Sequence, residues 1–453
     1  MSDFGALSVG LSGLLAHRKA LDVAGHNLAN VNTPGYSRQR VDLRAQTNPI
    51  TAAIFAGSTG VGKGVQAGTA YRLHDQFVEL RALQEHSTDA SLKQSQQVLT
   101  QIELAVNEPS DTGLSAQLNT FFAAWHDVAN RPDDLAARQQ LIETAGTLAA
   151  SFQQLDGSLS ALAENANYEL NASVVDVNTT AAQVADLNDR ILASVNADFP
   201  AGDLMDQRDQ LIQHLAEKVG ATVRPQENGV IDVYIGTNAL VRGNRTDVLR
   251  VDSTTTPGVS TVLWDRLGVA ATPGGSVGSL QASVNTTIPS YRAALTAVEQ
   301  QLTTDVNAIH TTGFDLNGAA GVAFFQMGPN GISVNPAVAA DPKLLAVAAT
   351  ATGLRDGSIA AKLASLTGPG NAYNAFILHL GIESRTVNRQ VSTQSAVTEQ
   401  VDAARESMSG VNIDEEMTNM VAIQHAFDAS ARFLTAVDSM LETLIKSTGL
   451  VGR

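Results

Sequence analysis

Residues 420–444 read MVAIQHAFDASARFLTAVDSMLETL, and apolar side chains recur in this stretch at alternating intervals of three and four. This spacing predicts an amphipathic helix with a single apolar seam, as in coiled coils. The seam residues are Met420, Ile423, Phe427, Leu434, Val437, Leu441 and Leu444. The pattern therefore predicts a carboxyl-terminal helix that a second helix covers.

A second seam lies at the other end of the chain, in residues 4–28, FGALSVGLSGLLAHRKALDVAGHNL. Its seam residues are Leu7, Leu11, Leu14, Leu21 and Leu28. A single stripe is typical of a helix on a globular core, but stripes at both termini favour helices that pair with each other or with neighbouring copies. Ordering the two helices costs conformational entropy, and the free energy gained by burying their seams is about as large as this cost. We therefore expect both helices to be mobile in the free subunit.

Composition limits the classes of protein that this chain can belong to. A length of 453 residues exceeds one hydrophobic core and predicts two to four domains. No apolar run is long enough to span a membrane, and the first 30 residues lack the pattern of a cleaved signal peptide. A net charge of -16 without a basic cluster speaks against nucleic-acid binding. The absence of cysteine excludes disulfides and thiolate chemistry.

The region between the termini changes from helical to strand-like patterning and back. Asn228-Gly229 separates two apolar runs and predicts a β-hairpin over 222–235. Further strands are predicted over 239–242, 247–251 and 259–267. Helices are predicted over 73–104, 113–129, 133–165, 167–197, 203–218, 279–311 and, with a break at Ser409-Gly410, from 372 to 447.

The predicted fold is mainly α, with an inserted small β domain. We expect an elongated, multi-domain molecule in which the terminal helices pair as a coiled coil and the central helices form an antiparallel rod or bundle. The predicted domains are the terminal helices (1–36 and 409–453), an extended connector (37–72), the helical rod (73–218 and 279–408) and the β domain (219–278).

No motif predicts catalysis or a cofactor. Residues 57–64, GSTGVGKG, resemble a phosphate-binding loop, but Gly64 replaces the magnesium-binding hydroxyl and no helix is predicted to follow. An enzyme hypothesis would depend on Lys63 in this loop. Residues 315–318, DLNG, begin like a calcium loop but lack its closing glutamate, so we expect a turn. The sequence predicts no catalytic, metal or cofactor site and no enzymatic activity.

Residues 28–36, LANVNTPGY, resemble the amino-terminal signature of bacterial flagellar rod, hook and hook-associated proteins. The following Ser37-Arg38-Gln39 resembles the version in the hook-associated protein 1 family, the FlgK type. Further blocks that are similar to this family are residues 59–81, 203–209, 278–280, 306–318 and 409–416. Within the signature, Thr33-Pro34-Gly35 ends the helix and fixes the direction of the chain. The signature turn comprises Asn30, Thr33, Pro34, Gly35 and Tyr36.

The resemblance implies a structural protein of the hook–filament junction, which assembles as a ring on the distal hook and is required for filament attachment. The implied partners are further copies of the chain, the hook protein, a second junction protein of the FlgL type and an export chaperone of the FlgN type. Neither nucleic acid nor membrane is an expected partner. Export through the flagellar type III channel without cleavage would place the protein outside the cell. Another axial protein of the hook or distal rod, or an extracellular coiled-coil adhesin, stays as an alternative.

Overall fold

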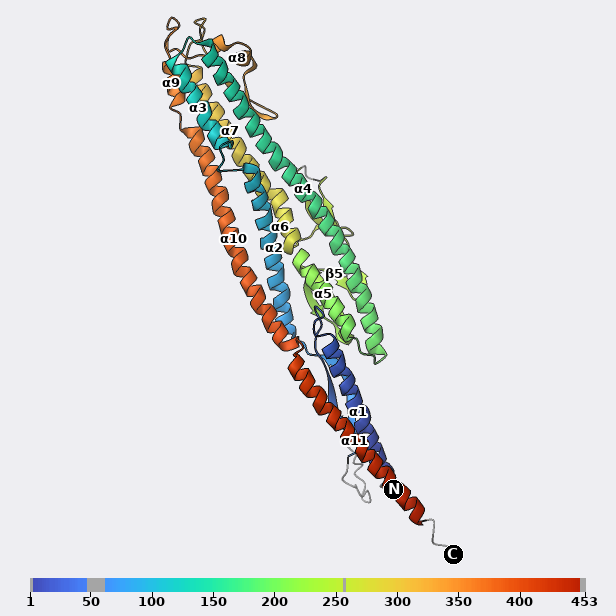
Figure 1. The fold of residues 1–453 in the computed structure, drawn as a ribbon. Helices are drawn as coiled ribbons and strands as arrows, with labels where there is room; N and C mark the ends of the chain where they lie inside the picture. Colours follow the sequence, from blue (N-terminus) through green and yellow to red (C-terminus); the bar gives the residue numbers. More distant parts are fainter. Residues whose placement is uncertain (1–2, 47–61, 256–257, 449–453) are drawn as a thin grey trace. The chain divides into compact units, whose positions relative to one another are not determined.

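The computed structural model describes residues 3–46, 62–255 and 258–448, most of them in helices (Figure 1). The helices are α1 Asp3–Ala29, α2 Gln76–Val106, α3 Leu114–Asn130, α4 Leu135–Asn196, α5 Gly202–Val219, α6 Gly275–Ala282, α7 Ile288–His310, α8 Pro336–Ala340, α9 Ser358–Ala364, α10 Gly368–Ser409 and α11 Ile413–Thr448. Short 3-10 helices span Glu227–Gly229 and Pro342–Leu344, and a π turn, Ser283–Thr287, joins α6 to α7.

The strands form four small antiparallel sheets. The strands are β1 Gln39–Ala45, β2 Val65–Arg72, β3 Thr222–Pro225, β4 Ile231–Ile235, β5 Asn238–Arg242, β6 Arg245–Thr246, β7 Leu249–Asp252, β8 Thr261–Trp264, β9 Val269–Ala270, β10 Phe325–Gly328 and β11 Gly331–Val334. They pair as β1-β2, β3-β4-β5-β6, β7-β8-β9 and β10-β11. The predicted fold class, mainly α with small β structure, is confirmed.

The predicted hairpin forms at the Asn228-Gly229 turn. Strands β3 and β4 pair with Val223 opposite Val233. Asn228 and Gly229 both have positive φ, 60° and 78°. Asparagine and glycine adopt this left-handed conformation at low cost, which is why the dipeptide predicted the turn correctly.

The chain folds into two compact units. The first comprises Met1–Ser87, Val177–Val248 and Ala396–Arg453, and the second comprises Thr88–Asp176 and Leu249–Ser395. The boundaries between them fall within α2, α4 and α10 and between β6 and β7. The strands that were expected in one β domain thus form two sheets, β3–β6 in the first unit and β7–β9 in the second. The domain limits derived from the sequence stay predictions.

An asparagine side chain ties each of these two sheets to a helix of its own unit. In the first unit, Asn188 of α4 donates hydrogen bonds to the carbonyl oxygens of Ile231 (2.8 Å) and Gly243 (2.9 Å). In the second unit, Asn285 of the π turn donates to Ser260 O and accepts from Ser260 N, both at 2.8 Å. Each of the two sheets that form between 219 and 278 thus has its own helical anchor.

Helix α4 corrects a second prediction. Separate helices were expected over 133–165 and 167–197, whereas α4 runs without a break from Leu135 to Asn196. Asn165 and Asn167 flank the expected break, but an asparagine costs a helix well under 1 kcal/mol relative to alanine, so the helix continues through them. The buried residues Leu159, Ala166, Leu170 and Val174 continue the helical period across the expected break.

An aromatic cluster forms the core of the second unit around α3 and α7. Its members, Phe121, Trp125, Phe324, Phe325 and His310, are at most 1% exposed. Ring centroids lie 4.7 Å apart for Phe324 and Phe325 and 5.3 Å apart for Trp125 and Phe324. The β10–β11 hairpin, which supplies Phe325 and directly follows Phe324, was not predicted from its glycine-rich sequence.

His310 joins this cluster to the backbone as a neutral imidazole. Its Nε2 accepts a hydrogen bond from Ala346 N (2.9 Å), so Nδ1 carries the proton and donates to Val322 O (2.6 Å). Burial lowers the pKa of His310 to about 4. The imidazole therefore links two loop segments without bringing a charge into the core.

Replacement of Phe121 by alanine is predicted to lower the free energy of unfolding of the second unit by about 3–5 kcal/mol, because it leaves a cavity among the rings. Urea unfolding followed by tryptophan fluorescence measures this directly, since both tryptophans of the chain, Trp125 and Trp264, lie in this unit. The matched control is Tyr168→Ala, in which the side chain is 73% exposed. Equal losses in both variants would contradict this account of the core.

The stability of the second unit is predicted to depend on pH through His310. The folded pKa of His310, about 4, lies below the unfolded value of about 6.5. The stabilisation that neutral His310 contributes to the folded unit is therefore complete above pH 6.5 and is lost as the pH falls toward 4. The loss amounts to about 3 kcal/mol. The measurement compares urea midpoints of wild type and His310→Gln across this range. Burial raises the pKa of Glu299 to about 7, so this residue makes stability fall as the pH rises toward 7. This opposite effect is the same in wild type and in His310→Gln. If the urea midpoints of wild type and His310→Gln changed in parallel with pH, His310 would not be the source of the pH dependence.

Candidate assembly site

Helices α1 and α11 lie side by side and antiparallel in the first unit (Figure 1). A Cβ atom placed on Gly10 would come within 2.9 Å of Leu434 Cγ, and one on Gly13 within 3.2 Å of Ser430 Oγ. Further along α1, Asn27 donates a hydrogen bond to Glu416. Glycines at the contact thus let the two helices approach closely, and the coiled-coil geometry of the pair stays a prediction.

The predicted seam of α11 lies on the covered side of the helix. Val437 is buried, and the other covered seam residues are partly buried: Met420, Ile423, Phe427, Leu434 and Leu441. Leu444 differs, because its side chain is 52% exposed. The seam is therefore covered up to Leu441, with Leu434 packed against Gly10 of α1, while its role in assembly stays a prediction.

The seam of α1 is less simple than the leucine spacing indicated. Four leucines are partly buried: Leu7, Leu14, Leu21 and Leu28. Leu11 is 51% exposed. The buried positions belong instead to small residues and one amide: Gly10, Ala16, Ala24 and Asn27. Helix α1 also packs on β1 and β2, so its covered surface is wider than one seam. A search for large apolar residues could not detect contacts made by glycine and alanine.

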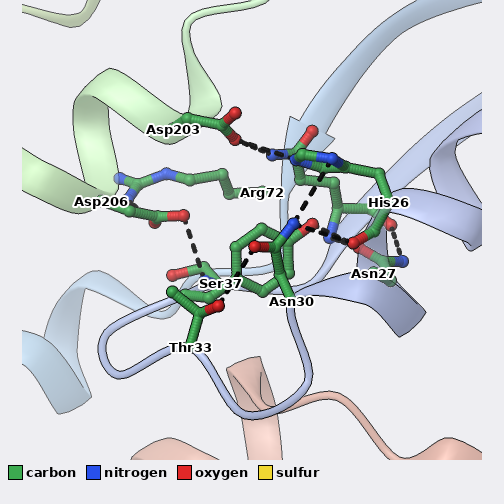
Figure 2. A network of polar contacts seen from close by, with 10 residues as sticks. His26, Asn27, Asn30, Thr33, Ser37, Arg72, Asp203 and Asp206 are labelled. Atoms are coloured by element: carbon green, nitrogen blue, oxygen red, sulfur yellow. Dashed lines mark hydrogen bonds and ion pairs between the residues drawn. The ribbon is translucent and has the colours of Figure 1, made fainter.

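The side chain of Asn27 belongs to the polar network next to the signature turn (Figure 2). Its side chain is 1% exposed. The amide nitrogen donates to Gln39 O (2.9 Å) and Glu416 Oε2 (3.1 Å), and the amide oxygen accepts from Gln39 N (2.9 Å) and Tyr36 OH (2.8 Å). One side chain thereby joins α1, the signature turn, β1 and α11.

The signature turn ends α1 through local hydrogen bonds. Asn30 Nδ2 donates to His26 O (3.0 Å), and Thr33 Oγ1 donates to Asn30 Oδ1 (3.1 Å) (Figure 2). Gly35 has a φ of +74°, and Gln210 donates a hydrogen bond to Pro34 O. The expected change of direction after the helix is therefore built from the side chains of the signature itself.

Tyr36 lies against this turn with its hydroxyl directed into the network. Its ring packs edge-on against His26, with centroids 5.5 Å apart. Burial, followed by the charges of Asp203, Asp206 and Glu416, raises the pKa of the phenol well above its usual value. The hydroxyl consequently stays protonated and available to donate to Asn27.

Three aspartates of α5, spaced three residues apart, hold the chain that leaves the turn, and Figure 2 labels Asp203 and Asp206 among them. Asp203 accepts from Gln39 Nε2 (2.9 Å) and pairs with His26 Nε2 (3.2 Å). Asp206 accepts from Ser37 N (3.1 Å) and Arg72 Nη1 (2.6 Å), and Asp209 Oδ2 lies 2.8 Å from Arg72 Nη2. These hydrogen bonds give the block 203–209 a positioning role that the sequence did not reveal.

Electrostatics explain why Arg72 lies between two of these carboxylates. Burial lowers the pKa of the guanidinium, but Asp209 and Asp206 outweigh this effect and raise it overall. Burial raises the pKa of Asp206, and the hydrogen bonds from Arg72 and Ser37 only partly oppose that shift. Each charge in the cluster thus depends on its partner for compensation.

Arg38 fixes the break between α10 and α11. Its backbone nitrogen donates to Ser409 O (2.8 Å), and its guanidinium contacts Glu415 (2.9 Å) and Glu416 (2.6 Å). A Cβ atom on Gly410 would lie 2.4 Å from Glu406 O, so the close turn requires glycine. The break expected at Ser409-Gly410 is confirmed, and Arg38 sets the start of the last helix.

The segments whose sequences resemble ligand-binding loops can be compared with the motifs that they resemble. They contain no group of three or more histidine, aspartate or glutamate side chains suited to a metal ion. The glycine-rich stretch from 57 to 61 lies outside the described residues, and β2 rather than a helix follows Lys63. Asp315 accepts from Asn317 N and Ala319 N, both at 2.8 Å, as expected for a turn. Within the described ranges, no helix has the length and apolarity that a membrane span requires.

Replacement of Gly35 by alanine is predicted to loosen the signature turn by about 1–3 kcal/mol, because a side chain at φ +74° is strained. Its Cβ atom would also lie 2.1 Å from Gln210 Nε2. Amide hydrogen exchange of residues 30–39 measures the effect, with roughly tenfold faster exchange for each 1.4 kcal/mol. Gly25→Ala is the control, since nothing lies within 4 Å of its Cβ position. Unchanged exchange in Gly35→Ala would show that this turn does not depend on glycine.

Known flagellar families match three parts of the chain. Residues 99–325, about half of its length, match the flagellar hook-associated protein FlgK helical domain. Residues 7–36 match the flagella basal body rod protein family, and residues 404–447 match the carboxyl-terminal domain of the basal body rod FlgEFG proteins. The helical-domain match distinguishes this chain from axial proteins that share only the terminal segments.

Individual relatives agree with these matches. Flagellar hook-associated protein 1 of Bacillus subtilis is 28% identical over 100% of both chains. The Escherichia coli protein of that name is 31% identical over 76% of this chain and 63% of its own length. The solved flagellar hook junction protein FlgK of Burkholderia pseudomallei is 26% identical with a TM-score of 0.50, covering 55% of this chain and 46% of that one. The chain therefore belongs to the FlgK family of flagellar hook-associated proteins and is a structural protein of the hook–filament junction.

Proposed function

We propose that this chain assembles as a ring of subunits on the distal hook and thereby attaches the filament. The observation that carries the proposal is the apolar surface that remains on the α1–α11 pair after its seam is covered. Leu11 and Leu15 on α1, and Met440 on α11, are 51%, 55% and 70% exposed. Contact with neighbouring copies would remove this surface from water.

The proposed partners follow from the segments that the chain shares with other axial proteins. Both terminal segments match families of basal body rod proteins, which supports packing against the hook protein at one end of the ring. A second junction protein of the FlgL type would contact the other end, and an export chaperone of the FlgN type would hold the carboxyl-terminal helix before export. Export is proposed to proceed through the flagellar channel without cleavage. The role is structural and involves no catalysis, cofactor, nucleic acid or membrane.

Leu434→Asp is predicted to block incorporation into the junction while leaving the second unit folded. The new carboxylate would replace an apolar side chain that packs against Gly10 in the helix pair, and burying a charge at such a contact is costly. The expected result is loss of swimming in soft agar, flagellin released into the medium, and an unchanged tryptophan fluorescence transition. The control is Thr435→Asp, which places the same charge on the exposed neighbouring residue.

Motile Leu434→Asp cells with ordinary filaments would contradict the role of the helix pair in assembly. A deletion strain tests the junction function independently of this variant. Filaments that stay attached without the protein would reject the junction role and favour the adhesin alternative. Uniform cross-linking along the whole hook would instead favour a hook-type subunit.

A further inference from the structure

The outward face of α2 in the first unit carries an exposed aromatic side chain. Phe77 is 76% exposed, and Leu80, at 38%, and Arg81 lie on the same face of the helix. Asp75 caps the helix, accepting hydrogen bonds from Phe77 N (2.8 Å) and Val78 N (3.3 Å). Phe77 thus lies on an ordered helical turn, so its backbone would lose little conformational entropy on binding. Aromatic and arginine side chains are typical of the central residues of protein interfaces.

The opposite face of α2 is occupied within the same unit. Leu83 is buried, and His86 Nε2 lies 3.0 Å from Asp402 Oδ1 of α10. Glu79 lies 3.8 Å from Arg405 of α10. The helix is therefore fixed by its inward face. On the outward face Phe77 and Leu80 are exposed, and Arg81 Nε lies 3.8 Å from Glu85 Oε1 of the same helix.

A cleft of about 420 Å³ opens beside the signature turn, on the inward side of α2. This volume is within the range of pockets that enclose small groups. The apolar side chains in the lining are Val31, Pro34, Leu83 and Val411. The carboxylates in the lining are Glu79, Asp206, Asp209, Asp402 and Glu406. The one basic side chain in the lining is Arg405. Asp206 and Asp209 already pair with Arg72, and Glu79 and Asp402 pair with Arg405. Glu406 is exposed at the edge of the cleft. The cleft therefore suits an apolar side chain accompanied by a cation that lies beside Glu406.

We infer that the Phe77, Leu80 and Arg81 face of one copy docks in the signature-turn cleft of the next copy in the ring. Phe77 would contact the apolar lining, and Arg81 would pair with Glu406, which is exposed at the cleft. This inference rests on the proposed ring. The two surfaces lie on different faces of α2, so the contact is head-to-tail, and such contacts generate rings or helical turns rather than isolated pairs.

Site-directed disulfide cross-linking tests the contact without background, because the chain contains no cysteine. Two single-cysteine variants, Phe77→Cys and Val411→Cys, are expressed together in a deletion strain, and isolated hook–filament complexes are oxidised. The expected product is a covalent dimer that forms only when both variants are present. Tyr168→Cys replaces Phe77→Cys in the control and is expected to give no dimer, because residue 168 is exposed but belongs to the second unit.

Charge variants test the role of Arg81. Arg81→Glu in the Phe77→Cys copy is expected to lower the yield of dimer several-fold, and Glu406→Arg in the Val411→Cys copy is expected to restore it. Dimers from Phe77→Cys alone would indicate a symmetric contact and overturn the inference. Absence of the mixed dimer in assembled, motile cells would overturn it as well, while the junction function would stand. Detached filaments in the deletion strain confirm that function separately.

Discussion

The amide of Asn27 is the interaction on which the rest of the first unit depends. Its four hydrogen bonds join the end of α1 to the backbone of Gln39, to Tyr36 and to Glu416 of α11. A shorter or apolar side chain at this position would leave buried donors and acceptors unpaired, at about 1–3 kcal/mol for each group. The direction of the chain after α1 and the start of α11 are thus set by the same side chain.

Around this amide, α5 provides a second level of support that is mainly ionic. Asp206 and Asp209 hold Arg72 at the end of β2, and Asp203 holds Gln39 at the start of β1. The two strands of this ribbon are therefore fixed at one end by a helix that follows more than a hundred residues later. A two-stranded ribbon has little stability of its own, so α1 and α5 supply most of its support.

Local patterns predicted the elements that local interactions determine. The seam of α11, the turn at Asn228-Gly229 and the break at Ser409-Gly410 each follow from periodicity or backbone freedom within a few residues. The continuous α4 was predicted as two helices, although its buried positions continue the helical period across the expected break. The family resemblance identified the signature turn and the class of protein before any geometry was known.

Long-range partners could not be predicted from the sequence. His26 meets Asp203 and Asn27 meets Glu416, and nothing near these residues in the chain indicates the partner. The glycines at the α1–α11 contact were missed for a different reason, because close packing by small residues leaves no apolar pattern. A sequence shows which residues favour a contact, but only the fold shows which contacts are made.

The antiparallel pairing of α1 with α11 also has a consequence for the order of events during synthesis. Helix α1 leaves the ribosome before α11, and the Glu416 side chain that pairs with Asn27 follows it by 389 residues. Until α11 has been translated, α1 lacks the partner that covers Gly10. The first unit can therefore be completed only after α11 has emerged, and a nascent chain that stops before α11 would leave this side of α1 uncovered.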